Sequence, residues 1–205
     1  MKSSTIIGGA SSQYKRNAAD FYSTPRECTI ALLDSYQRLF EGSRVWEPAC
    51  GSGAISKVLE ERRLAVVSTD LNDQGYGDTG LNFLNADCNC GSIITNPPFN
   101  LAAKFIEHAA TFNVPFAMLI KSTYWHAAKR YDLFQRTKPM AVIAMSWRPA
   151  MSPERGKSGT MDFIWTVWDR KPAKNTQYIV AKFKSDRRCG VSLPSPIPRS
   201  KRRTS

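Results

Sequence analysis

The sequence predicts an α/β fold: a mixed, mostly parallel sheet with helices on both faces. Strand-like and helix-like segments alternate along most of the chain, which is the pattern of parallel strands joined by crossover helices. A glycine-bearing turn, "CGSG" at residues 50–53, lies between the first strand and the first helix. The last two strand-like segments are separated by a loop, 148–160, that is too short for a crossover helix, so we expect these two strands to pair antiparallel.

The first half of this pattern contains four expected strands. Apolar and β-favouring residues place them at 44–49, 64–70, 83–87 and 92–95. Between the first two, Ile55, Val58 and Leu59 share one face of a helix, because their spacing follows the helical repeat. The fourth segment, "SIIT", runs directly into Asn-Pro-Pro-Phe, which can continue neither a strand nor a helix.

The second half contains two further helices and three strands. Leu101, Phe105 and Ala109 are four residues apart and predict a helix that ends before Pro115. A near-continuous apolar strand is expected at 115–121, followed by a helix at 124–136. Two strands, at 140–147 and 161–169, then form the antiparallel pair that closes the sheet.

The length of 205 residues suits one domain with a substantial core. We expect this domain to span residues 20–184, between a flexible N-terminal segment at 1–19 and a basic tail at 185–205 that is rich in Pro, Ser and Arg. No apolar run approaches the ~20 residues of a membrane span. The apolar segment near the N-terminus is too short for a secretory signal, so a cytoplasmic location is expected.

The charge of the chain favours a polyanionic partner. Lys and Arg number 29 against 17 Asp and Glu, which gives a formal net charge of +12. A basic surface of this size is typical of nucleic-acid-binding proteins, with a solubilising surface as the alternative. The five cysteines lack the spacing of a disulfide framework, and His108 and His126 do not complete a zinc site with Cys88 and Cys90. We therefore expect reduced thiols and no bound metal.

The segment "EPACGSG" (47–53) lies where an open α/β sheet binds nucleotide-like ligands, at the carboxyl end of a strand. Asp70 ends the second strand, about twenty residues further on, where an acidic side chain can accept hydrogen bonds from both hydroxyls of a ribose. The loop is not a P-loop, since no Gly-Lys-Ser/Thr follows. It does not match G-x-G-x-x-G either, since Ser56 occupies the third glycine position. A tight turn with a helix cap is the alternative interpretation.

Three motifs in this order carry a resemblance to a known family. "EPACGSG" followed by "NPPF" (96–99) resembles the signature of the S-adenosylmethionine-dependent amino methyltransferases, whose DNA N6-adenine members carry Glu-Pro-x-x-Gly-x-Gly and Asn/Asp-Pro-Pro-Tyr/Phe. Upstream, "DFYSTP" (20–25) is similar to the Thr-Pro cofactor segment of the γ-ordered group and to small phage-type adenine methyltransferases. The resemblance implies a Rossmann-like class I methyltransferase fold with a seven-stranded sheet and an antiparallel last strand.

The resemblance also implies a site for S-adenosylmethionine. The upstream segment would line the methionine end, the glycine loop would surround the methionine and ribose, and Asp70 with Leu71 would hold the ribose and flank the adenine. Asp87, with Cys88 beside it, would bond the adenine edge, with a buried or loop-capping Asp87 as the alternative. The cofactor residues so implied are Tyr22, Thr24, Pro25, Glu47, Pro48, Cys50, Gly51, Gly53, Asp70, Leu71, Asp87, Cys88 and Asn96.

The same resemblance implies that Asn96, Pro97, Pro98 and Phe99 are catalytic. The exocyclic amine of adenine is a weak nucleophile because its lone pair is delocalised into the ring. The Asn96 side-chain oxygen and the Pro97 carbonyl would accept its two hydrogens, with the prolines fixing both acceptors in place. Phe99 would stack on the target base after it flips out of the duplex. A strand-ending turn with a packed phenylalanine is the alternative.

The motif leaves the methyl acceptor open, because it also occurs in enzymes that methylate adenine in RNA, and related sites act on cytosine N4 in DNA or on protein glutamine. The positive charge favours double-stranded DNA, in a bacterial or phage-infected cell, with RNA as the next candidate. A catalytically silent nucleic-acid-binding homologue is the alternative of another class. We expect short insertions, 72–82 and 147–161, to read the target. The basic residues expected at the nucleic acid are Lys121, Arg148, Arg155 and Lys157.

Overall fold

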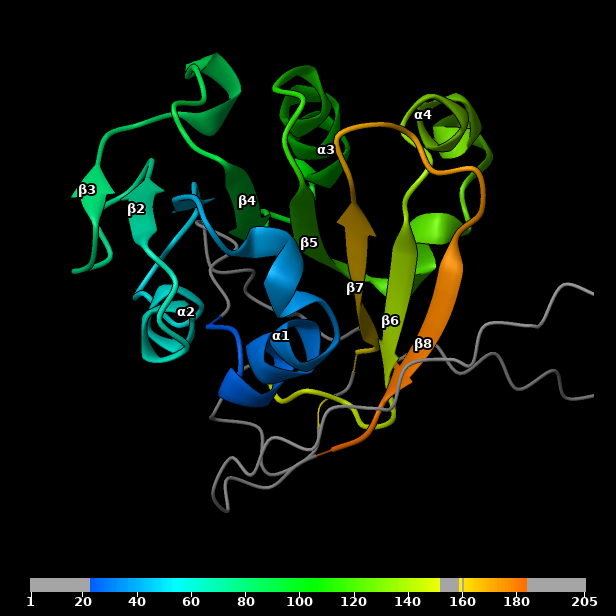
Figure 1. Cartoon of the computed structure of the whole chain (residues 1–205), viewed down its shortest axis with the longest axis horizontal. Coiled ribbons are helices and arrows are strands. Elements are labelled where there is room, and N and C mark those ends of the chain that lie inside the picture. The colour runs from blue at the N-terminus through cyan, green and yellow to red at the C-terminus, as the bar shows by residue number, and fades with distance from the viewer. Residues whose placement is uncertain (1–22, 152–158, 160, 184–205) are drawn as a thin grey trace, which may run out of the picture.

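The sheet has eight strands among the described residues, in the order β3-β2-β1-β4-β5-β7-β6-β8 (Figure 1). The structure is a computed structural model that describes residues 23–151, 159 and 161–183. Tyr22, Arg155 and Lys157 therefore lie outside the described residues, as do the segments 1–19 and 185–205. The strands are β1 (Val45–Glu47), β2 (Val66–Asp70), β3 (Asp78–Thr79), β4 (Ser92–Thr95), β5 (Phe116–Lys121), β6 (Ala141–Met145), β7 (Phe163–Trp168) and β8 (Gln177–Ala181).

The strands are parallel except for β7. β1 pairs in parallel with β2 and β4, β2 with β3, and β4 with β5. β7 lies between β5 and β6 and is antiparallel to both. This confirms the predicted antiparallel pairing of the segments at 140–147 and 161–169, and the predicted mixed, mostly parallel sheet.

The predicted number of strands is wrong, and the antiparallel strand β7 is followed by a further strand rather than being the last. Residues 83–87 do not form a strand, because the Asn82 side chain caps a turn of 3-10 helix, η1 (Phe83–Asn85). The short edge strands β3 and β8 are additional, so the sheet has eight strands rather than seven. The last strand, β8, is parallel to its neighbour β6, and as an edge strand it leaves Tyr178 and Val180 exposed.

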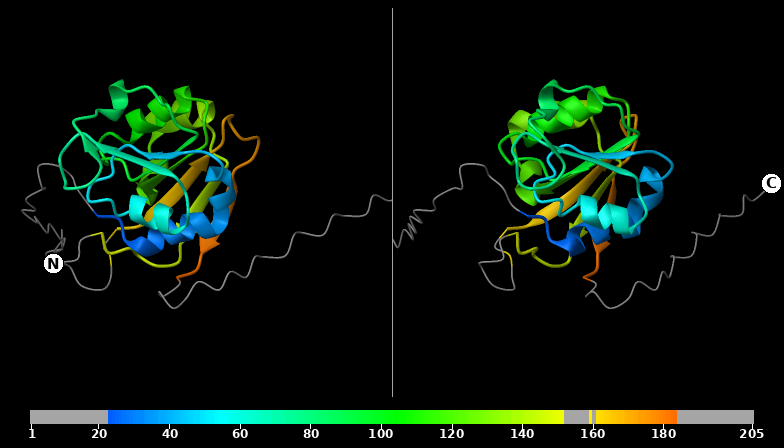
Figure 2. Two further views of the ribbon diagram at one scale, coloured as in Figure 1. Left: turned by 60° about the vertical axis from the view of Figure 1, so that its left-hand side comes forward. Right: turned by 90° about the vertical axis from the view of Figure 1, so that its left-hand side faces the viewer.

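Helices cover both faces of the sheet (Figure 2). Hydrophobic packing places α1 (Arg26–Phe40) and α2 (Ser56–Glu61) in the core on one face, and α3 (Ala102–Thr111) and α4 (Tyr131–Arg136) in the core on the other. The helices predicted after the glycine loop and before Pro115 are confirmed as α2 and α3. The helix predicted at 124–136 is interrupted by extended backbone at Ala127, where φ is −142° and ψ is 116°.

Side chains along β5 pack alternately into the two hydrophobic cores, one on each face of the sheet. Phe116, Met118 and Ile120 pack in the core that contains α3, while Ala117 and Leu119 pack in the core that contains α1 and α2. Successive side chains of a strand point to opposite faces, so a continuous apolar run is what a strand buried on both sides requires.

Helix α1 is absent from the sequence prediction, although its apolar residues are spaced at helical intervals. Cys28, Leu32 and Phe40 are fully buried in the core. The indole N–H of Trp165, in β7, donates a hydrogen bond to the Cys28 carbonyl at 2.7 Å. This contact joins α1 to the centre of the sheet and fixes the position of the Thr24–Pro25 segment that precedes the helix.

The carboxyl ends of four parallel strands meet at one edge of the sheet. β1 ends at Glu47, β2 at Asp70, β4 at Thr95 and β5 at Lys121. The glycine loop and Asn-Pro-Pro-Phe each follow one of these strands, so the topology brings them to the same edge. No helix in the described part of the chain is long and apolar enough to cross a membrane.

Candidate active site

A cavity of about 270 Å³ opens at this edge of the sheet. Its wall combines the segment before α1, the glycine loop, the end of β2 with the residues that follow it, and the Asn-Pro-Pro-Phe turn. The lining residues are Ser23, Thr24, Glu47, Pro48, Ala49, Cys50, Ser52, Ala54, Asp70, Leu71, Asn72, Gln74, Leu81, Asn82, Phe83, Asn96, Pro97, Pro98, Phe99, Asn100, Leu101 and Phe105. Residues more than seventy positions apart in sequence thus share one wall.

The Asp70 carboxylate ties the glycine loop to the end of β2. The Gly51 N–H donates to Asp70 Oδ2 at 2.9 Å, and the Asn72 N–H donates to Asp70 Oδ1 at 2.8 Å. Gly51 and Gly53 have φ values of 53° and 77°, a conformation that glycine adopts without strain. Each carboxylate oxygen has more than one lone pair, so these bonds leave acceptor capacity at Asp70, which lines the cavity.

Glu47 is buried at the end of β1 and anchors the start of α2. One of its oxygens, Oε2, accepts a hydrogen bond from the Ser56 N–H at 2.8 Å and a second from the Ser56 hydroxyl. The Ser56 and Ser68 hydroxyl oxygens lie 2.5 Å apart, which extends the network to β2. Burial raises the pKa of Glu47 to about 8, against the opposing effect of the Ser56 hydrogen bonds. At neutral pH the protonated form therefore predominates.

Part of the 72–82 insertion packs against the glycine loop. The Cys50 thiol donates to the Tyr76 carbonyl at 3.3 Å, and the Tyr76 hydroxyl donates to Glu60 at 3.0 Å. A Cβ atom on Gly53 would lie 2.6 Å from the Tyr76 ring, so only glycine permits this approach. The contact is not evident in the sequence, where Tyr76 is one aromatic residue in a polar loop.

The Asn-Pro-Pro-Phe turn follows β4, as predicted. The Asn96 side-chain nitrogen, Nδ2, donates to Thr24 Oγ1 at 3.0 Å. The Leu101 N–H donates to the Pro98 carbonyl at 2.9 Å and leads the chain into α3. Pro97 is buried, while Asn96, Pro98 and Phe99 are partly exposed in the cavity wall.

Phe99 lies beside one of the basic residues predicted to contact nucleic acid. The Lys121 ammonium is 4.1 Å from the centre of the Phe99 ring. The ring of Phe163, the partner of Lys121 across the β5–β7 ladder, is 5.6 Å from that of Phe99. A cation at the face of an aromatic ring is attracted by the ring quadrupole, so the Phe99 ring and a positive charge are presented together at the edge of the cavity.

Asp87 and Cys88 are not part of the cavity wall, which in this region consists of Leu81, Asn82 and Phe83. Asp87 is exposed. The role predicted for Asp87 and Cys88 at the cofactor adenine therefore has no support from their position. Asn82 and Phe83 line the cavity but are not among the predicted cofactor or catalytic residues, because residues 83–87 are predicted to form a strand.

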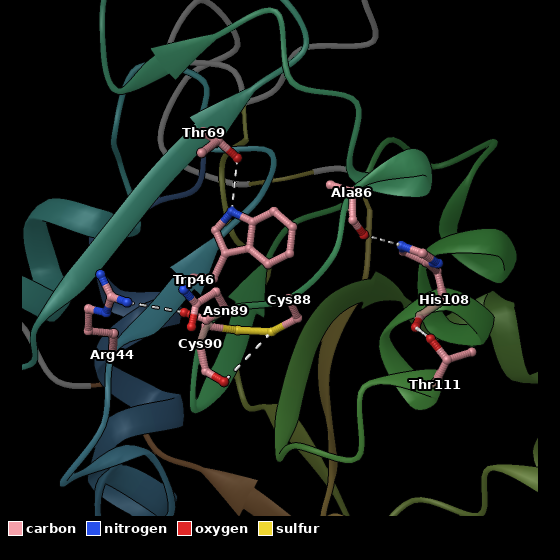
Figure 3. The surroundings of a disulfide bond; sticks show 9 residues. All are labelled: Arg44, Trp46, Thr69, Ala86, Cys88, Asn89, Cys90, His108 and Thr111. Carbon is pink, nitrogen blue, oxygen red and sulfur yellow. Dashed lines mark hydrogen bonds between the residues drawn. A yellow bond between two sulfur atoms is a disulfide. The ribbon is translucent and has the colours of Figure 1, made fainter.

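Cys88 and Cys90 form a disulfide (Figure 3), so the prediction of reduced thiols is wrong for this pair. Two residues of a C-x-C segment lie close enough to bridge when the loop folds back, as it does between η1 and β4. The loop is also held by Arg44, which donates to the Asn89 carbonyl at 3.3 Å, and by His108, whose Nε2 lies 3.0 Å from the Ala86 carbonyl. Cys28 and Cys50 are free and buried.

The remaining predicted site residues do not line the cavity. Pro25 directly precedes α1, and Gly51 and Gly53 belong to the backbone of the glycine loop. Arg148 is exposed and forms an ion pair with Asp162, with Nε and Oδ1 2.8 Å apart. In the described ranges no three His, Cys, Asp or Glu side chains converge as ligands of a metal ion would.

No protein-family model matches the sequence, and no curated protein matches it. The fold is similar to solved structures. A protein of Pyrococcus horikoshii assigned as an RNA methyltransferase matches with a TM-score of 0.55 and 14% identity, over 74% of this chain and 88% of that one. The EcoKI M protein of a type I restriction enzyme matches with a TM-score of 0.54 and 12% identity, over 81% of this chain and 49% of that one.

A modification subunit assigned to a type I restriction enzyme of Vibrio vulnificus YJ016 matches with a TM-score of 0.53 and 13% identity, over 83% of this chain and 49% of that one. The chain thus spans about half the length of the two restriction-enzyme proteins. At these identities the likeness concerns the fold. The chain has the Rossmann-like fold of methyltransferases, as the sequence predicts.

Proposed function

We propose that the chain is an S-adenosylmethionine-dependent methyltransferase that modifies the N6 amine of adenine in DNA. One observation carries this proposal: the three motifs converge on one cavity. Thr24, the glycine loop with Asp70, and the Asn-Pro-Pro-Phe turn share a wall, although they are spread over more than seventy residues. A turn that merely ended a strand would not need to meet the other two motifs.

The residues present fit the proposed cofactor. Asp70 offers a carboxylate for ribose hydroxyls, and Leu71 is 55% exposed beside it, where an apolar side chain could cover an adenine ring. The glycine loop lets the backbone approach a ligand closely. When bound, S-adenosylmethionine supplies an electrophilic methyl group on a sulfonium.

The acceptor half of the cavity supports a planar amine as the substrate. Asn96 and Pro97 offer a side-chain oxygen and a backbone carbonyl, which could accept the two hydrogens of an amine and raise the electron density on its nitrogen. Because β4 and two prolines hold these groups, little reorganisation accompanies the reaction. Phe99 offers a ring on which a base could stack, with a contribution of roughly 1–3 kcal/mol. A base within a duplex would first have to flip out.

DNA is the proposed polymer because the chain is strongly basic and because two of the similar structures belong to restriction enzymes. We propose that residues 20–184 form the catalytic domain and that it acts on double-stranded DNA in the cytoplasm of a bacterium or of a phage-infected host. Lys121 and Arg148, with Arg155, Lys157 and the basic tail, are the proposed phosphate contacts.

RNA adenine is the second candidate, favoured by the likeness to the Pyrococcus horikoshii protein. A transfer assay separates the candidates. The full chain would be incubated with tritiated S-adenosylmethionine and, in parallel, with unmethylated duplex DNA, single-stranded DNA, total RNA and a protein extract. Label in DNA is the expected result. Label confined to RNA or protein would overturn the proposed substrate, and no label in any sample would overturn the proposed activity.

A further inference from the structure

Thr24 contacts the proposed catalytic amide directly. Thr24 is 6% exposed, and its hydroxyl oxygen accepts a hydrogen bond of 3.0 Å from Asn96 Nδ2. The two residues are 72 positions apart in sequence. The contact exists because the segment before α1 crosses the carboxyl end of β4, where both residues line the cavity.

A side-chain amide needs such a partner if it is to serve as an acceptor. Its oxygen accepts hydrogen bonds, its nitrogen donates them, and the two ends have nearly the same shape. An amide rotated by half a turn would direct N–H groups at the acceptor amine, which also carries N–H groups, and the two would repel. In the structure the Thr24 hydroxyl oxygen receives the Nδ2 hydrogen, so the amide nitrogen lies on the Thr24 side and the amide oxygen on the other side.

We propose that Thr24 is a positioning residue that fixes the orientation of the Asn96 amide, so that its oxygen rather than its nitrogen faces the methyl acceptor. This inference rests on the proposed function. It is separate from the cofactor contact predicted for Thr24, because it concerns the hydroxyl group and Asn96 rather than the methionine end of the cofactor.

Two substitutions separate the hydroxyl from the rest of the Thr24 side chain. Thr24→Val keeps the branched shape but removes the hydroxyl, whereas Thr24→Ser keeps the hydroxyl. We expect Thr24→Val to lower kcat, measured at saturating S-adenosylmethionine so that a change in cofactor Kd does not contribute, about tenfold, and Thr24→Ser to retain most of the activity. Equal thermal stability of the two variants would show that both are folded.

A second background tests the orientation itself. An aspartate at position 96 has two equivalent oxygens, so it accepts a hydrogen bond in either orientation and needs no positioning partner. We therefore expect Thr24→Val to reduce kcat much less in an Asn96→Asp background than in the wild-type background, and the double-mutant cycle measures this difference. The exchange rate of the Asn96 side-chain amide hydrogens, followed by NMR, should rise in Thr24→Val and not in Thr24→Ser, whether or not the protein is active.

Three results would overturn the inference: an unchanged kcat in Thr24→Val, a weaker cofactor Kd as its only effect, or the same fold loss in the Asn96→Asp background. If the wild-type chain transferred no methyl group, the proposed function would fail, and the amide exchange rates of Thr24→Val and Thr24→Ser would still test whether Thr24 orients the Asn96 amide. The inference is supported if kcat falls in Thr24→Val but not in Thr24→Ser, with the wild-type protein active.

Discussion

Glu47 and Asp70 are both carboxylic acids beside the glycine loop, but their surroundings give them different tasks. Asp70 accepts two backbone hydrogen bonds at the rim of the cavity and has oxygen lone pairs left for a ligand. Glu47 is 1% exposed, is bonded to Ser56 and has a pKa raised by burial to about 8. Glu47 is therefore a structural anchor of the loop, and its predicted contact with the cofactor stays a prediction.

Glu47→Gln tests this assignment through the pH dependence of stability. The folded state holds the Glu47 proton up to a pKa of about 8, while the unfolded chain releases it near 4.5. The folded state therefore binds more protons between these values, and the contribution of Glu47 to stability falls as the pH rises through this window. A neutral glutamine avoids this loss, so the variant should gain stability relative to the wild type by an amount on the order of a few kcal/mol between pH 4.5 and pH 8.

Urea denaturation at pH 5 and at pH 8 measures this change in the unfolding free energy. Glu41→Gln, at an exposed site after α1, is the control for the loss of one carboxylate. A difference between Glu47→Gln and wild type that is the same at both pH values would contradict the assignment.

At the scale of elements, the glycine loop is held from three sides. Glu47 joins it to α2 through Ser56, Asp70 joins it to the end of β2, and Tyr76 covers Gly53 from the outside. The insertion that contains Tyr76 was expected to read the target sequence. Its contact with the glycine loop gives this part of the insertion a structural role in holding that loop, and its role in recognition stays a prediction.

Gly53→Ala should destabilise the protein more than Gly42→Ala. Both glycines have positive φ, 77° and 82°, so each alanine carries a similar backbone strain of about 1–2 kcal/mol. At Gly53 the new Cβ would also lie 2.6 Å from the Tyr76 ring, whereas nothing lies within 4 Å at Gly42. We expect an additional loss of about 1–3 kcal/mol in urea denaturation, and weaker S-adenosylmethionine binding for Gly53→Ala only. Equal losses for the two variants would refute the packing role of Tyr76.

Lys121 lies at the end of β5, at the same edge of the sheet as the cavity, and should contact a phosphate beside the target base. Lys121→Ala should weaken DNA binding and reduce the slope of log K against log salt concentration by about 1, with cofactor affinity unchanged. Lys171→Ala is the matched control, because Lys171 is exposed and follows β7 at the opposite edge of the sheet. If both variants had the same salt slope, Lys121 would not be a DNA contact.

At the scale of the whole molecule, the site forms because neighbouring strands are parallel and end at the same edge of the sheet. This arrangement could be predicted from the sequence. Alternating strand and helix segments predict the sheet, and its carboxyl edge then gathers the glycine loop, Asp70 and the Asn-Pro-Pro-Phe turn. Six of the predicted strands are observed. The edge strand β3 could not be predicted in this way because it has only two residues, whereas β8 contains the β-favouring residues Tyr178, Ile179 and Val180 and is missing from the prediction although its pattern favours a strand.

Contacts between distant side chains are the part of the site that sequence reasoning could not supply. Nothing in the sequence pairs Thr24 with Asn96, Tyr76 with Gly53, or Glu47 with Ser56, because each contact depends on how separate segments pack. The Cys88–Cys90 disulfide and the η1 turn are likewise products of how the chain folds before β4. The motifs therefore predict which chemistry the cavity could perform, while the packing determines which residues hold it in place.

The most direct test of this account is to identify the methylated nucleoside. Duplex DNA would be treated with S-adenosylmethionine and either the wild-type chain or Asn96→Ala, digested to nucleosides and compared with modified standards. We predict N6-methyldeoxyadenosine with the wild-type chain and, because the variant lacks the acceptor oxygen, a loss of product by about two orders of magnitude or more with Asn96→Ala. Equal product from both proteins, or a different methylated nucleoside, would contradict the role assigned to the Asn-Pro-Pro-Phe turn.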